Sequence, residues 1–410
     1  MRSIRIMAAS ITAAVIGIAG FALESAAQRT PSSAHRRTLI VPPLPSTWIE
    51  SPVASPPSDT EVRRQDVTVA TTAQGTKVIA WLERRLDNGL PPDDGHPVVA
   101  TLAPNASQWL VTPHADVELY TISSTYRGRL VGVRALTDRI LRWVYADGVA
   151  ETSYVPATGT VSIGLVTCAF APPALGVVFA QWTALGPPEV HDVFALTGSD
   201  STPTQTHLAR TSVHPQWLTA TGPDARSCFV LAAERRASSQ GDSRLFGVAV
   251  TPRGSAAVEI DASDRAYAST GVVIGQDGVP HVFYTLENYY APSAPAERPR
   301  QYTMVHASQT RSGWMRETID APTGAQIVAA IASARGLHLL TVGSLPQLGH
   351  HELRYWSKRS AADTWRSTVV ASGWLQQDRN AFALWADDHG AIIVAAVGTD
   401  DRVVTYTPAH

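Results

Sequence analysis

The sequence predicts an all-β fold, a seven-bladed β-propeller closed by a strand from the N-terminal part of the chain. Three observations lead to this prediction. A short β-unit recurs about every fifty residues, a tight turn marks each copy, and the last copy lacks one strand. A four-stranded unit of this length cannot bury both faces alone, so neighbouring units must stack, and a ring of such stacks is a propeller.

The clearest copy of the unit spans residues 271–320. It contains an apolar strand, a turn at Gly278, and a second strand that begins near His281. A long polar loop follows, and then two further strands, at 301–305 and from Gly313. We expect this segment to form one complete blade.

The turn between the first and second strands recurs along the chain. A seventh copy, at residues 223–226, lacks the glycine that marks the others. The six marking glycines are Gly75, Gly128, Gly176, Gly278, Gly336 and Gly390. A second marker agrees with this spacing, because Tyr302, Tyr355 and Tyr406 are expected on the third strand of three successive units.

The final unit ends early, with strands near 392–395 and 403–406 and no fourth strand before His410. The segment 46–51 (STWIES) resembles 363–368 (DTWRST), which opens a fourth strand in the preceding unit. We therefore expect the N-terminal segment to form the outer strand of the last blade. This closure removes an open sheet edge, which would otherwise invite aggregation.

The first residues are typical of a signal peptide, because Arg2 and Arg5 precede an apolar stretch and small residues precede Gln28. We expect a signal peptide over 1–27, a linker over 28–37 and a single propeller domain over 38–410. An uncleaved anchor is the alternative, although the apolar stretch is short for spanning a bilayer. The mature protein is then expected to be a secreted or periplasmic monomer without a membrane span, and its Ala- and Arg-rich composition suggests a bacterial source.

The formal net charge is −2, which argues against a nucleic-acid-binding surface. The chain has 2 cysteines, Cys168 and Cys228, which fall on adjacent predicted blades. In an exported protein we expect them to form a disulfide, and two buried free thiols are the alternative.

The loops between the second and third strands (b–c loops) are mostly long and polar, whereas the a–b turns are short. In a propeller the b–c loops share one face with the connections between blades. Long irregular loops are kept mostly where they carry function, so this b–c face is the predicted binding face. The alternative is that these loops only shield the edges of the blades.

Three glutamates, Glu83, Glu234 and Glu287, follow the second strand of their units at the same register. We expect them around the mouth of the central channel, where carboxylates, guanidinium groups and aromatic rings suit a glycan. The alternative is a set of solvated ion pairs, which contribute little. The predicted ligand-binding residues are Glu83, Arg84, Arg134, Trp182, Glu234, Arg235, Tyr284, Glu287, Tyr289, Tyr290 and His351.

His281 and His338 occupy the same place after the turn in two units, which favours a structural role. The segments 114–116 and 350–352 also carry histidines, but neither has a partner at metal-ligand spacing. No metal and no other cofactor is therefore predicted. The chain also lacks a nucleophile elbow, a phosphate-binding loop and a zinc-protease motif.

The unit at 271–320 (GVVIGQDGVPHVFY … QYTMVHA … SGWMRETID) resembles the repeat of sialidase-like propellers, which include bacterial neuraminidase repeat (BNR) and Asp-box proteins. The segment 360–365 (SAADTW) keeps the Thr-Trp of an Asp box but lacks its glycine and its aligned aspartate. Sialidases use three arginines, a Tyr–Glu nucleophile pair and an acidic Asp. No position here matches those motifs, so the resemblance implies the propeller type and no catalytic residue.

These observations favour an exported propeller that binds a ligand through its b–c face without catalysis. A glycan is the favoured ligand, and a cell-surface partner is the broader class. The alternative is a glycan-active enzyme, either a hydrolase with paired carboxylates or a lyase with a Tyr/His pair. A third hypothesis is an assembly role in which the loops grip another protein.

Overall fold

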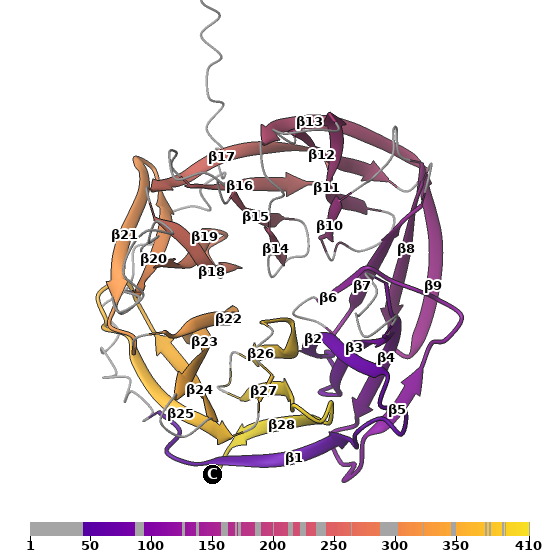
Figure 1. Cartoon of the computed structure of the whole chain (residues 1–410), viewed down its shortest axis with the longest axis vertical. Helices are drawn as coiled ribbons and strands as arrows, with labels where there is room; N and C mark the ends of the chain where they lie inside the picture. Colours follow the sequence, from indigo (N-terminus) through magenta and orange to yellow (C-terminus); the bar gives the residue numbers. More distant parts are fainter. Residues whose placement is uncertain are drawn as a thin grey trace, which may run out of the picture. The chain divides into compact units, whose positions relative to one another are not determined.

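Seven four-stranded sheets make up the part of the chain that the computed structural model describes. In Figure 1 these sheets stand around a common centre. Six sheets have their first strand innermost, whereas in the seventh the N-terminal strand is outermost. The predicted all-β, seven-bladed propeller is confirmed. The described residues are 44–86, 94–124, 128–136, 139–156, 163–168, 170, 174–184, 190–199, 201–211, 216–221, 227–234, 243–263, 265–287, 302–322, 324–345, 350–373, 375–376, 379–387, 389 and 391–409.

The first three blades are consecutive antiparallel meanders. Blade one comprises β2 (Val62–Thr71), β3 (Lys77–Arg85), β4 (His96–Leu102) and β5 (Leu110–Pro113). Blade two comprises β6 (Thr121–Ser124), β7 (Leu130–Ala135), β8 (Arg139–Ala146) and β9 (Val149–Pro156). Blade three comprises β10 (Ile163–Thr167), β11 (Ala174–Ala184), β12 (Val190–Ser199) and β13 (Thr202–Thr211).

The next three blades repeat the same order. Blade four comprises β14 (Gln216–Thr221), β15 (Cys228–Glu234), β16 (Ser243–Thr251) and β17 (Gly254–Ser263). Blade five comprises β18 (Ala266–Ile274), β19 (Pro280–Glu287), β20 (Tyr302–Thr310) and β21 (Gly313–Ile319). Blade six comprises β22 (Gln326–Ser333), β23 (Gly336–Leu345), β24 (His350–Lys358) and β25 (Arg366–Gly373).

Blade seven is assembled from both ends of the described chain. A short 3-10 helix, η1 (Arg379–Ala381), leads into β26 (Phe382–Ala386), β27 (Ile392–Val397) and β28 (Val403–Pro408). The fourth strand is β1 (Trp48–Ala54), which pairs antiparallel with β28 from Trp48 opposite Pro408 to Ala54 opposite Val403. The predicted closure of the ring by an N-terminal strand is therefore confirmed.

The core lies between the blades rather than within one of them. Every residue of β27 is buried, whereas most of β21, an outer strand, is exposed or half-buried. One apolar cluster combines Leu340 of blade six, Trp385 of blade seven and Trp81 of blade one. Such contacts between blades stabilise the ring, since each unit packs only on its neighbours.

The marking glycines that the structure describes lie at the predicted turns, with one exception among the five. Gly75 and Gly278 have φ angles of +82° and +78°, in the left-handed region that glycine adopts at low cost. Gly176 is not in the turn but inside β11, where an added Cβ would lie 2.5 Å from the ring of Phe170. That glycine is required by close packing, and the turn itself lies earlier in the chain. Gly390 lies outside the described residues.

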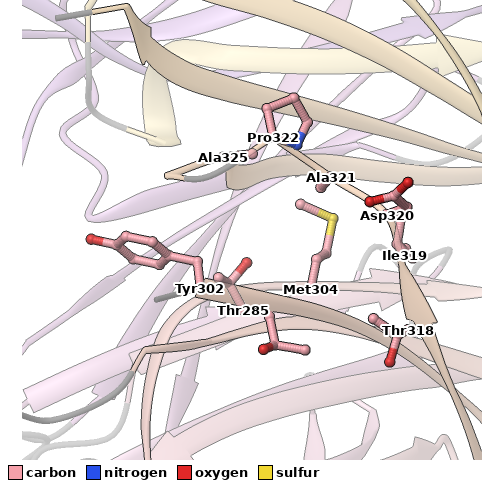
Figure 2. A pocket seen from close by; sticks show the side chains of 10 residues that line it. Thr285, Tyr302, Met304, Thr318, Ile319, Asp320, Ala321, Pro322 and Ala325 are labelled. Carbon is pink, nitrogen blue, oxygen red and sulfur yellow. The ribbon is translucent and has the colours of Figure 1, made fainter. Parts of the chain in front are cut away.

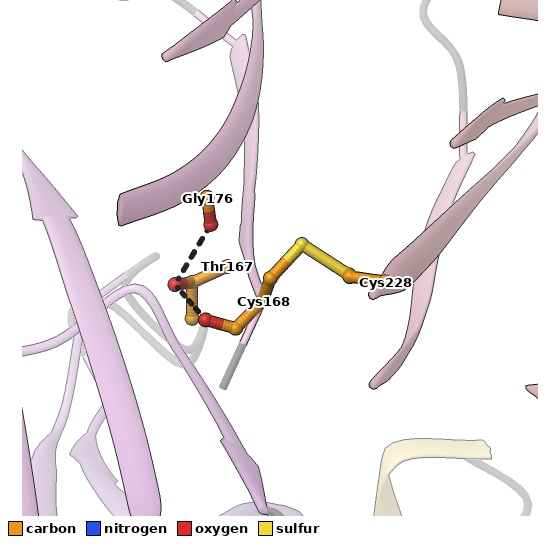
Figure 3. Close-up of a disulfide and its surroundings, with 4 residues drawn as sticks. All are labelled: Thr167, Cys168, Gly176 and Cys228. Carbon is orange, nitrogen blue, oxygen red and sulfur yellow. Dashed lines mark hydrogen bonds between the residues drawn. A yellow bond between two sulfur atoms is a disulfide. The ribbon is translucent and has the colours of Figure 1, made fainter. Parts of the chain in front are cut away.

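A disulfide links blade three to blade four (Figure 3). Cys168 follows β10 directly, and Cys228 is the first residue of β15. Their Cα atoms are 5.8 Å apart, and 60 residues of sequence separate them. On the chain-entropy account, a cross-link over a loop of this length stabilises the fold by about 4 kcal/mol.

The helical segments among the described residues do not reach the length and apolarity that a membrane-spanning helix requires.

Candidate functional site

The b–c face is the end of the ring that carries the b–c loops and the connections from one blade to the next. Most b–c loops lie outside the described residues, at 87–93, 185–189, 235–242, 288–301 and 346–349. The b–c turn of blade seven, at 398–402, is described and brings Asp401 against blade one. The site is therefore built from the strand ends, the blade connections and this turn.

Glu83, near the end of β3, is held by two neighbours from its own blade. Its Oε1 accepts a hydrogen bond from Nε of Arg64 at 2.9 Å and lies 3.4 Å from Nε1 of Trp81. The Arg64 guanidinium also lies over the Trp81 ring, 5.4 Å from the centroid. The Glu83 side chain keeps 30% of its surface exposed, so it lines the face but is already fully engaged in an ion pair.

Asp401 joins blade seven to blade one. Its side chain is nearly buried and accepts hydrogen bonds from the backbone amide of Arg64 at 3.1 Å and from Nε2 of Gln376 at 3.0 Å. Nη1 of Arg63 donates to the same carboxylate at 3.3 Å, and Nη1 of Arg64 donates to the Asp401 carbonyl at 3.1 Å. Asp401 therefore fastens the point at which the ring closes.

Arg84, the next predicted residue, is buried rather than solvated. Its guanidinium donates to Oε1 of Gln65 at 2.7 Å, to Oδ2 of Asp66 at 2.5 Å and to the carbonyl of Tyr120 in blade two at 2.9 Å. Only 7% of the residue is exposed. Arg84 therefore links blades one and two, and it is not a surface ion pair of the weak kind that the alternative interpretation assumed.

Arg134, near the end of β7, repeats this role between blades one and two. Its Nε lies 2.9 Å from Oδ2 of Asp94, and its Nη1 lies 2.5 Å from Oε2 of Glu118. The Arg134 side chain is 31% exposed. The guanidinium groups of Arg84 and Arg134, which were among the predicted ligand-binding residues, thus already bind carboxylates of the protein.

Tyr284 is a correction to the predicted set. Its side chain is 1% exposed and packs edge-to-face against Tyr267, with ring centroids 5.5 Å apart. Burial and the nearby Asp261 carboxylate raise the pKa of the Tyr284 hydroxyl. The alternation of β19 directs this side chain into the core between blades four and five, so we leave it out of the ligand-binding set.

Several predicted residues fall where the structure gives no side chain. Arg235, Tyr289 and Tyr290 lie outside the described residues, and so do the side chains of Trp182 and Glu234. His351 is half-buried on β24 at the b–c end of blade six. These positions remain predictions.

A pocket of about 360 Å³ lies on the b–c face of blade five (Figure 2). Tyr302 and Met304 line it from the start of β20, and Thr285 lines it from β19. Thr318 and Asp320 line it from the end of β21 and the connection to blade six. Figure 2 shows the Met304 side chain rising between Tyr302 and Asp320.

The polar groups of this pocket are positioned by hydrogen bonds. The hydroxyl of Tyr302 donates to Oε1 of Glu287 at 3.4 Å, which ties a predicted site residue to the pocket. The hydroxyl of Thr303 accepts a hydrogen bond from Nη2 of Arg265 at 3.1 Å. A second carboxylate, that of Asp320, lines the pocket directly. The arrangement offers an aromatic ring, several hydroxyls and the Asp320 carboxylate to one ligand, and Glu287 is bonded to Tyr302 outside the lining.

From the sequence, Tyr302 was identified only as a marker of the repeat, aligned with Tyr355. The structure shows that the two tyrosines do not occupy equivalent positions in their blades. Tyr302 pairs with Glu287 at the b–c end of its blade, whereas Tyr355 pairs with Leu340, in the middle of β23. His306, which pairs with Phe283, is the counterpart of Tyr355. The break in register at Tyr302 was the available signal that this tyrosine serves the face rather than the core.

Among the described residues, no group of three or more His, Cys, Asp or Glu side chains is arranged to hold a metal ion.

No family model matches the chain, and no curated protein matches it. Among solved structures, it is similar to an alpha-L-arabinofuranosidase of Fusarium graminearum, with TM-score 0.48 and 11% identity over 88% of this chain and 97% of that chain. An ulvan lyase has TM-score 0.45 and 9% identity over 84% and 94%. The Aleuria aurantia lectin has TM-score 0.44 and 12% identity over 86% and 93%. Similarity at this level carries no argument about activity, so the function must be argued from the site.

Proposed function

We propose that the protein binds a glycan on its b–c face, with the pocket between Tyr302 and Asp320 as the subsite for one sugar. The observation that carries the proposal is the composition of this pocket: an aromatic ring, hydroxyl groups and a carboxylate around a volume of about 360 Å³. Small-molecule sites of roughly 300–1,000 Å³ are typical, and a few convergent polar groups orient the ligand in them. The pocket is at the small end of this range, which suits one residue of a longer chain.

The charges on this face favour recognition of hydroxyl groups over recognition of an acidic group. Arg84 and Arg134 are held by protein carboxylates, and freeing a partly buried guanidinium would leave its partner uncompensated. The pocket itself contributes the carboxylate of Asp320, with Glu287 behind Tyr302. A glycan with neutral sugars fits this arrangement better than a uronic or sialic acid.

The proposal is tested by a glycan array followed by calorimetry on the best ligand. Replacing Tyr302 with Ala removes the ring, and we expect affinity to fall at least about tenfold, equal to roughly 1.4 kcal/mol. Tyr154→Ala is the matched control, since Tyr154 lies on an outer strand and is 53% exposed. Equal affinity of Tyr302→Ala and the unmodified protein for every bound glycan would refute the proposal.

A second candidate is glycoside hydrolysis, favoured by one observation. The hydroxyl of Tyr302 donates to Glu287 beside the pocket that Asp320 lines, so a tyrosine–carboxylate pair and a second carboxylate are near one ligand volume. In this role Glu287 accepts the tyrosine proton, Tyr302 attacks the anomeric carbon, and Asp320 protonates the leaving oxygen. Water, which loses a proton to Asp320, then cleaves the glycosyl–tyrosine bond, and Glu287 returns the proton to Tyr302.

Fluorogenic aryl glycosides distinguish the two candidates. Tyr302→Phe keeps the ring and removes the hydroxyl, so a binding protein retains most of its affinity, whereas a hydrolase loses turnover. Release of fluorophore by the unmodified protein, abolished in Tyr302→Phe, would establish the enzyme. The lyase alternative requires a Tyr/His pair on this face, and Tyr284 cannot supply the tyrosine because it is buried.

We further propose that the blades are of the sialidase-like type and that the protein is exported after cleavage of residues 1–27. The incomplete Asp-box segment at 360–365 supports the blade type. The N-terminal apolar stretch supports export. Mass spectrometry of the mature N-terminus in a bacterial host tests the export: an intact N-terminus in the cell fraction would contradict it.

A further inference from the structure

A chain of polar side chains crosses the boundary between blades five and six, away from the b–c face. His281, His306 and Glu317 lie on successive strands of blade five, and Lys358 ends β24 of blade six. Nδ1 of His281 is 3.0 Å from Nε2 of His306, and Nδ1 of His306 is 2.7 Å from Oε1 of Glu317. Nζ of Lys358 donates to both carboxylate oxygens of Glu317 at 2.6 Å.

Trp365 completes the chain from blade six. Its Nε1 donates to Oε1 of Glu317 at 3.1 Å, and its ring stands edge-on to His306 with centroids 5.7 Å apart. A single carboxylate of blade five therefore receives two donors from blade six, Lys358 and Trp365. The Lys358 side chain is 5% exposed, so the lysine end of this contact is shielded from water, whereas the Glu317 side chain is 37% exposed.

The acceptors determine where the protons are. The Glu317 carboxylate can only accept, so Nδ1 of His306 carries a proton and donates. In a neutral His306 the other nitrogen, Nε2, must then accept, and Nδ1 of His281 donates to it. A second proton on His306 would place two N–H groups against each other and break this bond.

The surroundings keep both histidines neutral. The two rings are stacked 5.2 Å apart, and His306 is also stacked on Phe283 at 4.8 Å. Burial first, and then the neighbouring histidine, lower the pKa of His281 to about 4. Burial likewise lowers the pKa of His306, against the opposing effect of Glu317. The charged groups that act on the pair are Asp277, Glu317 and Lys358.

Blade six carries the same construction without the second histidine. His338 stands where His281 does, and its Nδ1 is 2.6 Å from the hydroxyl of Tyr355, the counterpart of His306. The position that pairs with Tyr355 on β25 is Thr368, where blade five has Glu317. Blade six is therefore an internal reference: a buried histidine in the same place, bonded to a tyrosine and not to a second histidine.

We propose that the chain from His281 through His306 and Glu317 to Lys358 is an acid-sensitive lock between blades five and six. At neutral pH the histidines are uncharged, and Glu317 is held by Lys358. In acid the histidines gain protons beside the Lys358 ammonium, the bond between them is lost, and the cations repel one another. The boundary then loosens locally, before the ring as a whole unfolds.

The direction of the effect follows from proton linkage. An exposed histidine titrates near its ordinary value of 6.5, whereas His281 in the closed boundary titrates at about 4. Between these values the open state binds a proton that the closed state does not, so stability falls as the pH falls through this window. Hydrogen bonds from Lys358 and His306 outweigh burial and lower the pKa of Glu317, so its contribution is also lost in acid, at still lower pH.

Opening of the lock is expected to weaken glycan binding in the pocket. This expectation rests on the proposed function, whereas the lock itself does not. Met304, Ile319 and Ala325 line the pocket and belong to the same apolar cluster as Phe283, on which His306 is stacked. Loosening this boundary is therefore expected to displace these three lining residues. Glycan affinity is therefore expected to fall in the same pH window.

Hydrogen–deuterium exchange on the full mature chain tests the lock without any ligand. Protection factors, corrected for the intrinsic pH dependence of exchange, are compared between about pH 7 and about pH 4.5. We expect protection in β20, β21 and β24 to fall about tenfold more than in β3 and β4 of blade one. His306→Tyr gives blade five the pattern of blade six, where burial alone lowers the pKa of His338 to about 4. We therefore expect this variant to reduce the excess by the part that the second histidine contributes, and to leave the part that comes from the burial of His281.

Two results would overturn the lock: an equal loss of protection in all blades, or the same excess loss in His306→Tyr as in the unmodified chain. Should His306→Tyr not fold, His281→Gln keeps a donor to His306 and removes one titrating ring, and it must reduce the excess in the same way. Loss of glycan binding at all pH values in Tyr302→Ala concerns only the proposed function, since the exchange experiment contains no glycan.

Discussion

Charged side chains hold both the boundary that closes the ring and the boundary between blades five and six, but with different chemistry. Between blades seven and one, Asp401 accepts hydrogen bonds from Arg63 and from the backbone amide of Arg64, and Glu83 holds the Arg64 guanidinium within blade one. Between blades five and six, Glu317 binds Lys358, and a histidine pair extends the contact. Arginine stays charged at every pH at which the protein folds, whereas histidine loses or gains its charge near neutrality. The boundary between blades five and six is therefore expected to respond to acid through its histidines, whereas arginines donate at the closure point.

On the b–c face, the charged residues at the end of β3 and the pocket of blade five also differ in role. The charged residues at the end of β3 were predicted to meet a ligand, and they instead hold blades one, two and seven together. No charge motif in the sequence indicated the pocket of blade five. This pocket combines hydroxyls and an aromatic ring with Asp320. A cluster of charges at a strand end is therefore a poor guide to a ligand site when the cluster can be satisfied by a neighbouring blade.

The largest expected effect is at the closure point. Asp401→Ala removes the buried carboxylate that accepts hydrogen bonds from the Arg64 backbone amide, from Gln376 and from Arg63. Because hydrogen bonds to a charged group contribute about 1.5–3 kcal/mol each, we expect a combined loss of about 3–5 kcal/mol. Urea unfolding followed by tryptophan fluorescence measures the loss. Asp400→Ala is the matched control, since Asp400 is adjacent and its side chain is 50% exposed, so a change within about 0.5 kcal/mol is expected. Equal effects of the two substitutions would show that Asp401 does not fasten the ring.

Removal of the disulfide, which joins blades three and four covalently, is expected to have the next largest effect on stability. Replacing Cys168 and Cys228 together with Ser is expected to cost about 2–4 kcal/mol, because the open chain gains freedom that the cross-link removed. Thermal unfolding with and without a reducing agent measures it. The reductant should destabilise the unmodified chain and leave the double variant unchanged; an unmodified chain indifferent to reductant would contradict the bond.

A smaller effect is expected at the boundary between blades five and six. Lys358→Met removes the donor that binds both oxygens of Glu317, and since that carboxylate is 37% exposed, water compensates in part. We expect a loss of about 1–3 kcal/mol, typical of a lost charged hydrogen bond. Lys77→Met replaces the other lysine of the chain and serves as the control, measured by the same unfolding titration. Destabilisation by Lys77→Met as large as that by Lys358→Met would remove the special role of the buried lysine.

Much of the architecture was predictable because it is periodic. The turns at Gly75 and Gly278, and the likeness of residues 46–51 to 363–368, predicted the blades and the strand that closes them. Gly176 misled in detail, because a glycine required by contact with Phe170 was taken for a turn glycine. Short-range patterns cannot distinguish these two reasons for glycine.

The site was less predictable, since it depends on which side chains meet across blade boundaries. Glu287 was predicted correctly to lie at the b–c end of its strand, but its partner Tyr302 was interpreted as a repeat marker. Tyr284 was assigned to the face although the alternation of β19 turns it into the core. A shift of one position along a strand decides whether a side chain points into the core or away from it. The sequence alone left the register of β19 uncertain.

By itself, the sequence determined the number of blades, the partner strand of β28 and the face that carries the long loops, because each is written in local repeats of turn and strand. Only the tertiary structure decided which charges are consumed between blades, where the histidine pair meets a carboxylate and a lysine, and where a pocket remains. The physical reason is that burial and ion pairing depend on the distances between side chains on different blades. Such distances arise only when the ring is closed.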